Sequence, residues 1–296
     1  MKNLTLLFTL IALISCNSTP RKDTKSDNIQ SAPASYKIEL LWESDTLLRT
    51  PESVLIDRER NILYVSNVNL NPWEKDGNGF ISKLDMDGNI INLKWIEGLH
   101  GPKGMGISGK SLFVADIDAL VEADIETGKI IKKIELEGKP DLNDITVSED
   151  GTVFVSGSTS NTIYELKNGA LEVYFKGGEE RFNGLFWEKE RMLLITSASS
   201  QFKEINHNTK EVKIIAENMG HGDAIAPVGD GGYLCTSWAG KIFYISANGE
   251  TTVLLDSEGL AENAADLDYS IQNKILYVPT FFKNQVKAYR LIKTDN

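Results

Sequence analysis

The chain has 296 residues, a formal net charge of -11 and an isoelectric point near 4.9. This acidic balance argues against a nucleic-acid-binding protein, whose electrostatic footprint is basic, and it suits a cationic ligand. A chain of this length buries about three quarters of its unfolded surface, so its stability does not require disulfide bonds.

Residues 1–16 are predicted to be a signal peptide. Lys2 precedes an apolar run from Leu4 to Ile14, which is too short to span a bilayer and is built like a signal h-region. The tetrapeptide L-I-S-C that ends at Cys16 resembles a bacterial lipobox, in which the cysteine is acylated. We therefore expect an exported lipoprotein of the cell envelope, held to the membrane through its lipid alone. The alternative is an ordinary signal peptide with an incidental cysteine.

Residues 17–35 contain Ser, Thr, Asn, Lys, Asp, Pro and Ala with almost no large apolar residue. This composition predicts a flexible tether. The remainder, residues 36–296, is expected to form one domain, because a single repeat occupies nearly all of it.

A five-residue pattern recurs along residues 36–296 at intervals of 51, 40, 40, 40 and 42 residues. The six segments are Glu52-Ser-Val-Leu-Ile, Lys103-Gly-Met-Gly-Ile, Asn143-Asp-Ile-Thr-Val, Asn183-Gly-Leu-Phe-Trp, Asp223-Ala-Ile-Ala-Pro and Ala265-Asp-Leu-Asp-Tyr. A period of about 40 residues with short strands and turns is typical of propeller blades. The sequence therefore predicts an all-β, six-bladed β-propeller.

Each repeat continues with β-rich runs separated by tight turns. Second strands such as Thr152-Val-Phe-Val-Ser are rich in β-branched and aromatic residues, and Asn168-Gly169 is a typical hairpin pair. The sixth repeat lacks an outer strand, and the segment Lys37–Glu43 matches the missing strand in length and alternation. We expect this N-terminal strand to close the last blade. The first repeat carries an extra loop, Asn67–Gly79, that would cover one face.

The first residue of the pattern gives it chemical meaning. If each repeat begins the innermost strand of a blade, then Glu52, Asn143, Asn183 and Asp223 converge on one mouth of the central channel. Two carboxylates and two amide oxygens form a hard donor set suited to Ca²⁺, with Mg²⁺ or Mn²⁺ as alternatives, and poorly suited to Zn²⁺. Asn-Gly and Asn-Asp pairs are also common turn formers, and that simpler interpretation stays open for any single pair.

The repeats resemble the senescence marker protein (regucalcin) and gluconolactonase family of six-bladed propellers, which bind one divalent metal ion in the channel. The resemblance covers about 260 residues. Its strongest motifs are Pro51-Glu52-Ser53, Asn143-Asp144-Ile-Thr-Val, Phe182-Asn183-Gly184-Leu185 and Gly222-Asp223-Ala224. By this resemblance Glu52, Asn183 and Asp223 are metal ligands, and Asn143 completes the metal site or contacts the substrate.

The resemblance implies a metal-dependent hydrolase of a lactone or related ester. Asp223 would be the general base, and His221 would assist proton transfer. Lys103 and His100, which lie at or before the second repeat, would contact an anionic substrate. Animal members have an arginine that helps hold the substrate two residues before the third-blade Asn, and Asp141 stands at that substrate-binding position here. This substitution puts gluconolactone itself in doubt as the substrate.

Two other functions remain open. One is a non-catalytic propeller that binds a small ligand or a protein partner, because one fold hosts many functions. The other is a strictosidine synthase-like or paraoxonase-like propeller, which predicts a catalytic histidine at the channel, with His100 and His221 as candidates.

Overall fold

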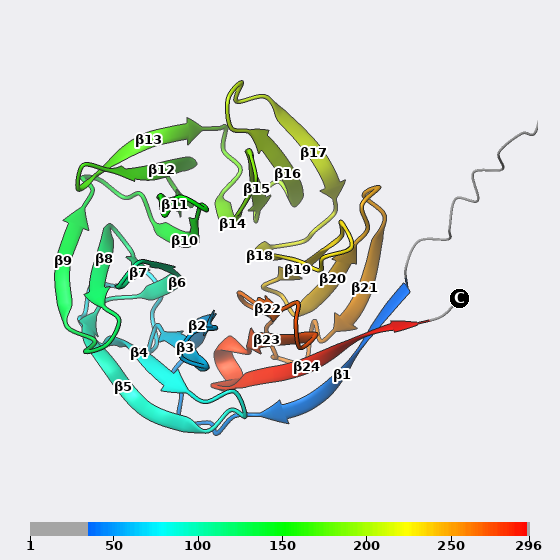
Figure 1. Cartoon of the computed structure of the whole chain (residues 1–296), viewed down its shortest axis with the longest axis horizontal. Coiled ribbons are helices and arrows are strands. Elements are labelled where there is room, and N and C mark those ends of the chain that lie inside the picture. Colours follow the sequence, from blue (N-terminus) through cyan, green and yellow to red (C-terminus); the bar gives the residue numbers. More distant parts are fainter. Residues whose placement is uncertain (1–34, 295–296) are drawn as a thin grey trace, which may run out of the picture. The chain divides into compact units, whose positions relative to one another are not determined.

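The computed structural model describes residues 35–294 as six four-stranded antiparallel sheets arranged in a ring (Figure 1). This arrangement confirms the six-bladed β-propeller. Within residues 35–294, no helix is long and apolar enough to cross a bilayer. The predicted signal peptide, with Cys16, and residues 17–34 of the predicted tether lie outside the described residues. Ser35, assigned to that tether, already begins strand β1 (Ser35–Glu43).

Each of the first five blades is built from four strands that follow one another along the chain, from the channel outward. Blade one contains β2 (Pro51–Asp57), β3 (Ile62–Asn67), β4 (Gly79–Leu84) and β5 (Ile90–Leu99). Blade two contains β6 (Pro102–Ser108), β7 (Ser111–Asp116), β8 (Ala119–Asp124) and β9 (Ile130–Glu135). Blade three contains β10 (Leu142–Val147), β11 (Val153–Gly157), β12 (Thr162–Lys167) and β13 (Ala170–Lys176).

The later blades keep the same order. Blade four contains β14 (Phe182–Glu188), β15 (Arg191–Thr196), β16 (Gln201–Asn206) and β17 (Val212–Glu217). Blade five contains β18 (Gly222–Pro227), β19 (Tyr233–Ser237), β20 (Lys241–Ile245) and β21 (Thr251–Asp256). Blade six contains β22 (Asp268–Ser270), β23 (Ile275–Pro279), the 3-10 helix η1 (Phe281–Lys283) and β24 (Val286–Thr294).

The N-terminal strand β1 supplies the outer strand of blade six, as predicted from the sequence. It pairs antiparallel with β24 from Ser35↔Thr294 to Glu43↔Lys287 (Figure 1). The ring is therefore closed by backbone hydrogen bonds between the two ends of the domain, and β24 is not left as an unpaired edge. Trp42 strengthens this closure because its ring packs 5.8 Å from that of Tyr277 in β23.

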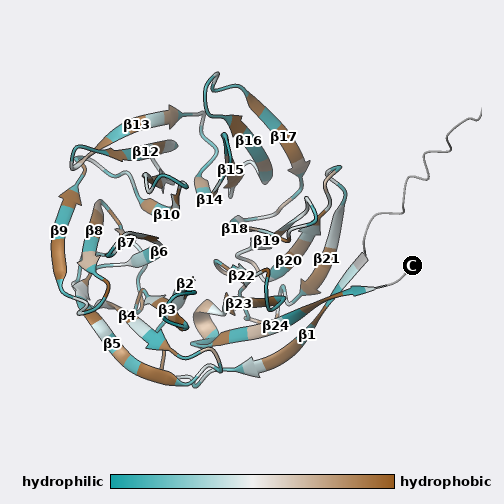
Figure 2. Ribbon diagram, viewed as in Figure 1, coloured by the Kyte–Doolittle hydropathy of each residue, from teal (hydrophilic) through white to brown (hydrophobic). Residues whose placement is uncertain are grey.

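The apolar core lies between neighbouring blades. Six clusters of buried apolar side chains each join residues of two adjacent blades, and together they run around the ring. Inner and middle strands such as β11 are buried throughout, whereas the outer strand β9 is mostly exposed. Figure 2 accordingly shows polar and apolar residues mixed along the outer strands. Because burial between blades fixes how the blades sit, the core also fixes the positions of the inner strands.

A β-bulge near the start of the inner strand positions the first residue of each repeat. In blade one the pairing of β2 with β3 jumps from Pro51 to Val54, so two residues leave the ladder. The same jump follows the first strand residue in the next four blades, at Pro102, Leu142, Phe182 and Gly222. The bulge therefore frees Glu52 and its four counterparts from the regular alternation of the sheet.

Hydroxyl groups of the second strand satisfy the backbone of three of these bulges. We call the first residue of each repeat its marker residue. In blades one, three and five, the N–H of the residue after the marker residue donates to a Ser or Thr side chain at 2.9–3.0 Å. The donor and acceptor pairs are Ser53 with Ser66, Asp144 with Ser156 and Ala224 with Thr236. The bulges are thus hydrogen-bonded features of the fold, without an orphaned backbone donor at these positions.

Removing β1 should destabilise the whole ring, because β24 would become an unpaired edge and Trp42 would leave the core. We expect a variant that begins at Asp45 to melt more than about 10 °C below one that begins at Ser35, or to aggregate. Thermal unfolding followed by circular dichroism measures this difference. Equal melting temperatures would show that closure by β1 does not stabilise the propeller.

Candidate functional site at the channel mouth

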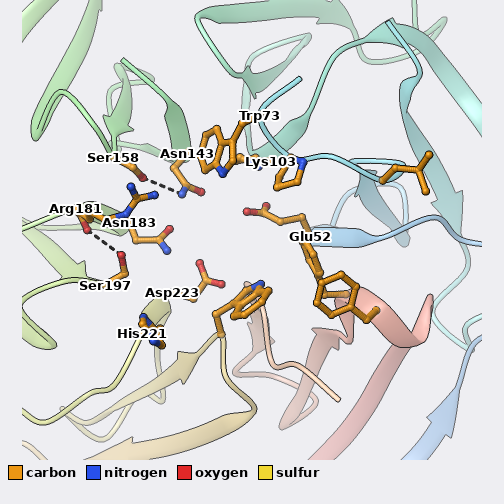
Figure 3. Close-up of a pocket in the computed structure, with 15 residues that line it drawn as sticks. Glu52, Trp73, Lys103, Asn143, Ser158, Arg181, Asn183, Ser197, His221 and Asp223 are labelled. Atoms are coloured by element: carbon orange, nitrogen blue, oxygen red, sulfur yellow. Dashed lines mark hydrogen bonds between the residues drawn. The ribbon is translucent and has the colours of Figure 1, made fainter. Parts of the chain in front are cut away.

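The marker residues of five blades meet at one mouth of the central channel (Figure 3). Glu52, Lys103, Asn143, Asn183 and Asp223 are each the second residue of an inner strand. All are buried, with between 1% and 8% of their surface exposed. They line a cavity of about 420 Å³, a volume within the range of small-molecule sites. The structure thus brings together the whole predicted ligand set.

The two amide side chains present oxygen atoms to this cavity. Asn143 donates from Nδ2 to Ser158 Oγ at 3.0 Å, and Ser158 Oγ donates to the carbonyl oxygen of Phe182 at 2.7 Å. This chain orients the Asn143 amide and leaves its oxygen toward Glu52 (Figure 3). Within residues 35–294, the buried Oδ1 of Asn183 accepts no hydrogen bond. A buried acceptor without a donor is costly, and a cation would satisfy it.

The carboxyl groups of Glu52 and Asp223 are buried, away from bulk water. Burial raises the pKa of Glu52 to about 7, and the positive charge of Lys103 opposes this rise. Burial also raises the pKa of Asp223 well above its usual range, and the nearby negative charges of Glu52 and Asp144 add to this effect. Both shifts have the same physical cause, which is the cost of an ionised carboxylate away from water. A positive charge near these two carboxylates would therefore stabilise their ionised forms.

Two further carboxylates lie beneath the first set, one place after the marker residues. Asp144 accepts a hydrogen bond from the N–H of Leu185 at 2.6 Å, which ties blade three to blade four. Asp266 accepts a hydrogen bond from the hydroxyl of Ser53 and so ties blade six to blade one. Burial raises the pKa of Asp144 to about 7 and that of Asp266 well above its usual range. Asp266 thus lies on the channel side of blade six, close to Glu52 and Asp223.

Lys103, the marker residue of blade two, places a positively charged side chain beside these carboxylates. Its ammonium group lies 4.2 Å from the centroid of the Trp73 ring, a cation–π arrangement. Burial lowers the pKa of Lys103, while the charges of Glu52 and Asp223 oppose that fall. The lysine therefore offsets part of the negative charge at the mouth without an ion pair or a hydrogen bond from its ammonium group in the described part of the chain.

The donor chemistry fits a hard divalent cation. Carboxylate and amide oxygens are ligands that Ca²⁺ accepts readily, and within residues 35–294 the buried Oδ1 of Asn183 has no hydrogen-bond donor that would compete with a cation. Across residues 35–294, no group of three or more His, Cys, Asp or Glu side chains has the geometry of a metal cluster. The proposed site differs from such a cluster because two of its four donors are amides.

Three residues predicted to assist the site lie at different places. His221 lines the cavity beside Asp223 (Figure 3). His100 lies apart from the lining residues, and its Nδ1 accepts a hydrogen bond from the N–H of Gly77 in the blade-one loop at 3.1 Å. Asp141 also lies outside the lining and accepts a hydrogen bond from the hydroxyl of Thr159. A direct substrate contact is therefore supported by position for His221 and by neither of the other two.

The cavity also contains residues that the sequence alone did not identify as site residues. Its apolar lining comes from the blade-one loop, from the turn after β19 and from η1, and consists of Leu70, Pro72, Trp73, Trp238, Phe281 and Phe282. Ser158, Arg181 and Ser197 add polar groups. Among these residues, only Trp73 could be suspected from the sequence, because it lies in the unusually long loop between β3 and β4. The other aromatic residues share no repeat position.

No described protein family and no curated protein matches this sequence. Solved structures do match the fold. A gluconolactonase from Xanthomonas campestris superposes with a TM-score of 0.67 at 12% identity, covering 89% of this chain and 96% of that one. An inactive His-to-Ala variant of virginiamycin B lyase from Staphylococcus aureus, determined with quinupristin, gives 0.62 at 13% identity, covering 87% and 100%.

A streptogramin B lyase gives a TM-score of 0.63 at 14% identity, covering 88% of this chain and 98% of that one. At these identities the comparisons establish the fold, and an activity has to be argued from the site. The chain therefore has a six-bladed propeller fold that matches the folds of a gluconolactonase and of virginiamycin B lyase.

Proposed function

We propose that this protein is a metal-dependent hydrolase of a lactone or related ester, with its active site at the channel mouth. The observation that carries the proposal is the convergence of four buried oxygen donors, Glu52, Asn143, Asn183 and Asp223, around an unsatisfied amide oxygen. A divalent cation held there, Ca²⁺ by donor chemistry or else Mg²⁺ or Mn²⁺, would polarise the ester carbonyl and stabilise the charge that develops on its oxygen.

The chain itself supplies the proton acceptor. Asp223 is buried at the cavity, and its pKa lies well above the usual range of an aspartate because of desolvation and neighbouring carboxylates. The proposed cation would keep this carboxyl group ionised, so that Asp223 could take the proton of the attacking water. His221 lies beside it in the cavity lining and is positioned to pass that proton to solvent.

Lys103 favours a second function, that of a non-catalytic propeller that binds a small ligand. Its ammonium group already offsets part of the negative charge of Glu52 and Asp223, so the fold would tolerate the carboxylates without a metal ion. The two functions differ in what they require at the mouth. A hydrolase needs a bound cation and a base, whereas a ligand-binding propeller needs only the cavity.

The cellular location is proposed from the sequence. Cys16 would carry a lipid that holds an exported protein at the cell envelope, with residues 17–34 as a tether between the lipid and the propeller. Contact with the membrane would then pass through the lipid alone, and the partner of the propeller would be a small-molecule substrate. The acidic charge balance speaks against a nucleic acid as partner.

Substitution of the base should remove turnover without unfolding the protein. We expect Asp223→Asn to lower kcat/KM for lactone opening at least about 100-fold in the presence of Ca²⁺, because the proton acceptor is lost. The matched control is Asp45→Asn, which changes an exposed aspartate away from the channel.

The reaction should be run in water enriched in ¹⁸O. Incorporation of the label into the carboxylate of the product would identify hydrolysis. Ring opening without incorporation would contradict hydrolysis and indicate elimination. Absence of turnover for a panel of lactones and esters would favour the ligand-binding propeller.

Removal of the Lys103 charge should strengthen cation binding, because the ammonium group competes with a divalent ion for the same carboxylates. We expect Lys103→Met to bind Ca²⁺ about tenfold more tightly than the wild type, equivalent to about 1.4 kcal/mol. The Ca²⁺ concentration that gives the half-maximal rise in melting temperature measures this change. Lys110→Met, at an exposed site, is the control, and unchanged or weaker binding by Lys103→Met would refute the competition.

A further inference from the structure

The cavity at the channel mouth has two chemically different walls. Ser158, Arg181, Ser197 and His221 lie along blades three to five, next to Asn143, Asn183 and Asp223 (Figure 3). The remaining wall is apolar and comes from the loop between β3 and β4, the residue after β19 and η1. A ligand in this cavity therefore meets polar groups on one side and aromatic rings on the other.

The aromatic wall is a packed structure. Phe281 and Phe282 lie with ring centroids 4.9 Å apart at 87°, and the Trp238 ring lies 5.4 Å from Phe281 and 5.9 Å from Phe282. Phe281 anchors this group because it is 4% exposed and packs against Val68 and Ala265. Its φ of 49° is in the left-handed region, which a phenylalanine adopts only when its surroundings hold it there. The rings are thus held in place before any ligand binds.

Large apolar side chains remain exposed around this wall. Leu70 is 75% exposed, Phe282 is 60% exposed and Trp73 is 38% exposed, and all three line the cavity. Exposed apolar groups gathered at a concave site mark a surface that a ligand covers. Because the three rings of the wall are mutually tilted by 75° to 87°, they form a corrugated surface, which suits a bulky apolar group better than a flat sugar ring.

The polar wall supplies a charge that is not used inside the protein. Arg181 lines the cavity, and its backbone N–H is fixed by the side chain of Asn161 at 2.7 Å. Among residues 35–294, its guanidinium group has no ion pair and no hydrogen bond. A free guanidinium at a cavity wall is suited to a carboxylate or another acceptor on the ligand.

From these two walls we propose that the ligand is an amphipathic lactone or ester that carries an aryl or alkyl group, and not a polyhydroxylated sugar lactone. This inference rests on the hydrolase function proposed above. The ester group lies at the oxygen donors, the apolar group contacts Phe282, Trp238 and Trp73, and an acceptor on the ligand faces Arg181. A sugar lactone would place hydroxyl groups against the rings of Phe281 and Phe282, which carry no hydrogen-bonding group.

The test compares an aryl-substituted lactone with a sugar lactone. Turnover is measured for γ-phenyl-γ-butyrolactone and for glucono-δ-lactone with Ca²⁺ present. Binding is measured separately, through the fluorescence of the tryptophans at the cavity, for the two ring-opened acids, 4-hydroxy-4-phenylbutyrate and gluconate. The binding measurement does not depend on turnover.

We expect the aryl acid to bind at least tenfold more tightly than gluconate. Phe282→Ala should weaken the aryl acid about tenfold and leave gluconate unchanged, whereas Val173→Ala, at a similarly exposed site on β13 (63%), should change neither. Arg181→Gln should weaken both acids. Because Phe282 is largely exposed, its removal leaves the anchoring residue Phe281 in place.

The outcomes separate the two proposals. Preferred binding of the aryl acid without lactone turnover would support the ligand class and refute the hydrolase. Turnover with glucono-δ-lactone preferred, equal binding of the two acids, or binding of neither would each overturn the ligand class. Turnover of the aryl lactone by the wild type, together with loss of the preference for the aryl acid in Phe282→Ala, would support both.

Discussion

The cost of burying carboxylates on the channel axis constrains everything at the mouth of this propeller. Glu52, Asp144, Asp223 and Asp266 are withdrawn from water, and burial raises the pKa of each. Buried carboxylates are tolerated in a fold when hydrogen-bond donors or positive charges compensate them, or when they take part in function. Backbone donors and Ser53 compensate the two deeper aspartates. Within residues 35–294, the charge of Lys103 offsets that of Glu52 and Asp223, and a hydrogen bond with Asn183 also stabilises the Asp223 carboxylate. The divalent cation proposed above would complete this compensation.

A β-bulge that recurs from blade to blade positions the marker residues at the channel mouth. A β-bulge at the start of each of the first five inner strands releases the marker residue from the ladder, and the cores between blades bring the strands close together. Gly184 shows how close this approach is, because a Cβ there would lie 2.1 Å from the carbonyl oxygen of Asp223. The glycine in the Asn183-Gly184 pair therefore serves packing between blades four and five, not a turn.

The sequence predicted the site residues that occupy a repeat position and missed those that do not. The repeat located Glu52 and Asp223 because a fixed interval in the chain becomes a fixed position around the ring, and the absent outer strand predicted closure by β1. The aromatic wall could not be predicted in this way, because Trp238 and Phe281 come from different blades and share no repeat position. Blade six also departs from the repeat: β22 begins at Asp268, three residues after the expected marker Ala265, so the position of Asp266 depended on the fold.

The most direct test of the proposed metal site is calorimetric titration of Ca²⁺ into the soluble propeller at pH 7, in two buffers of different ionisation enthalpy. We predict saturable binding at one site that Asp223→Ala and Asn183→Ala both abolish. Protons should be released on binding, because the pKa of Glu52 is about 7 before the ion binds. A folded wild-type protein that binds none of Ca²⁺, Mg²⁺ and Mn²⁺ would contradict the metal site, and with it the hydrolase.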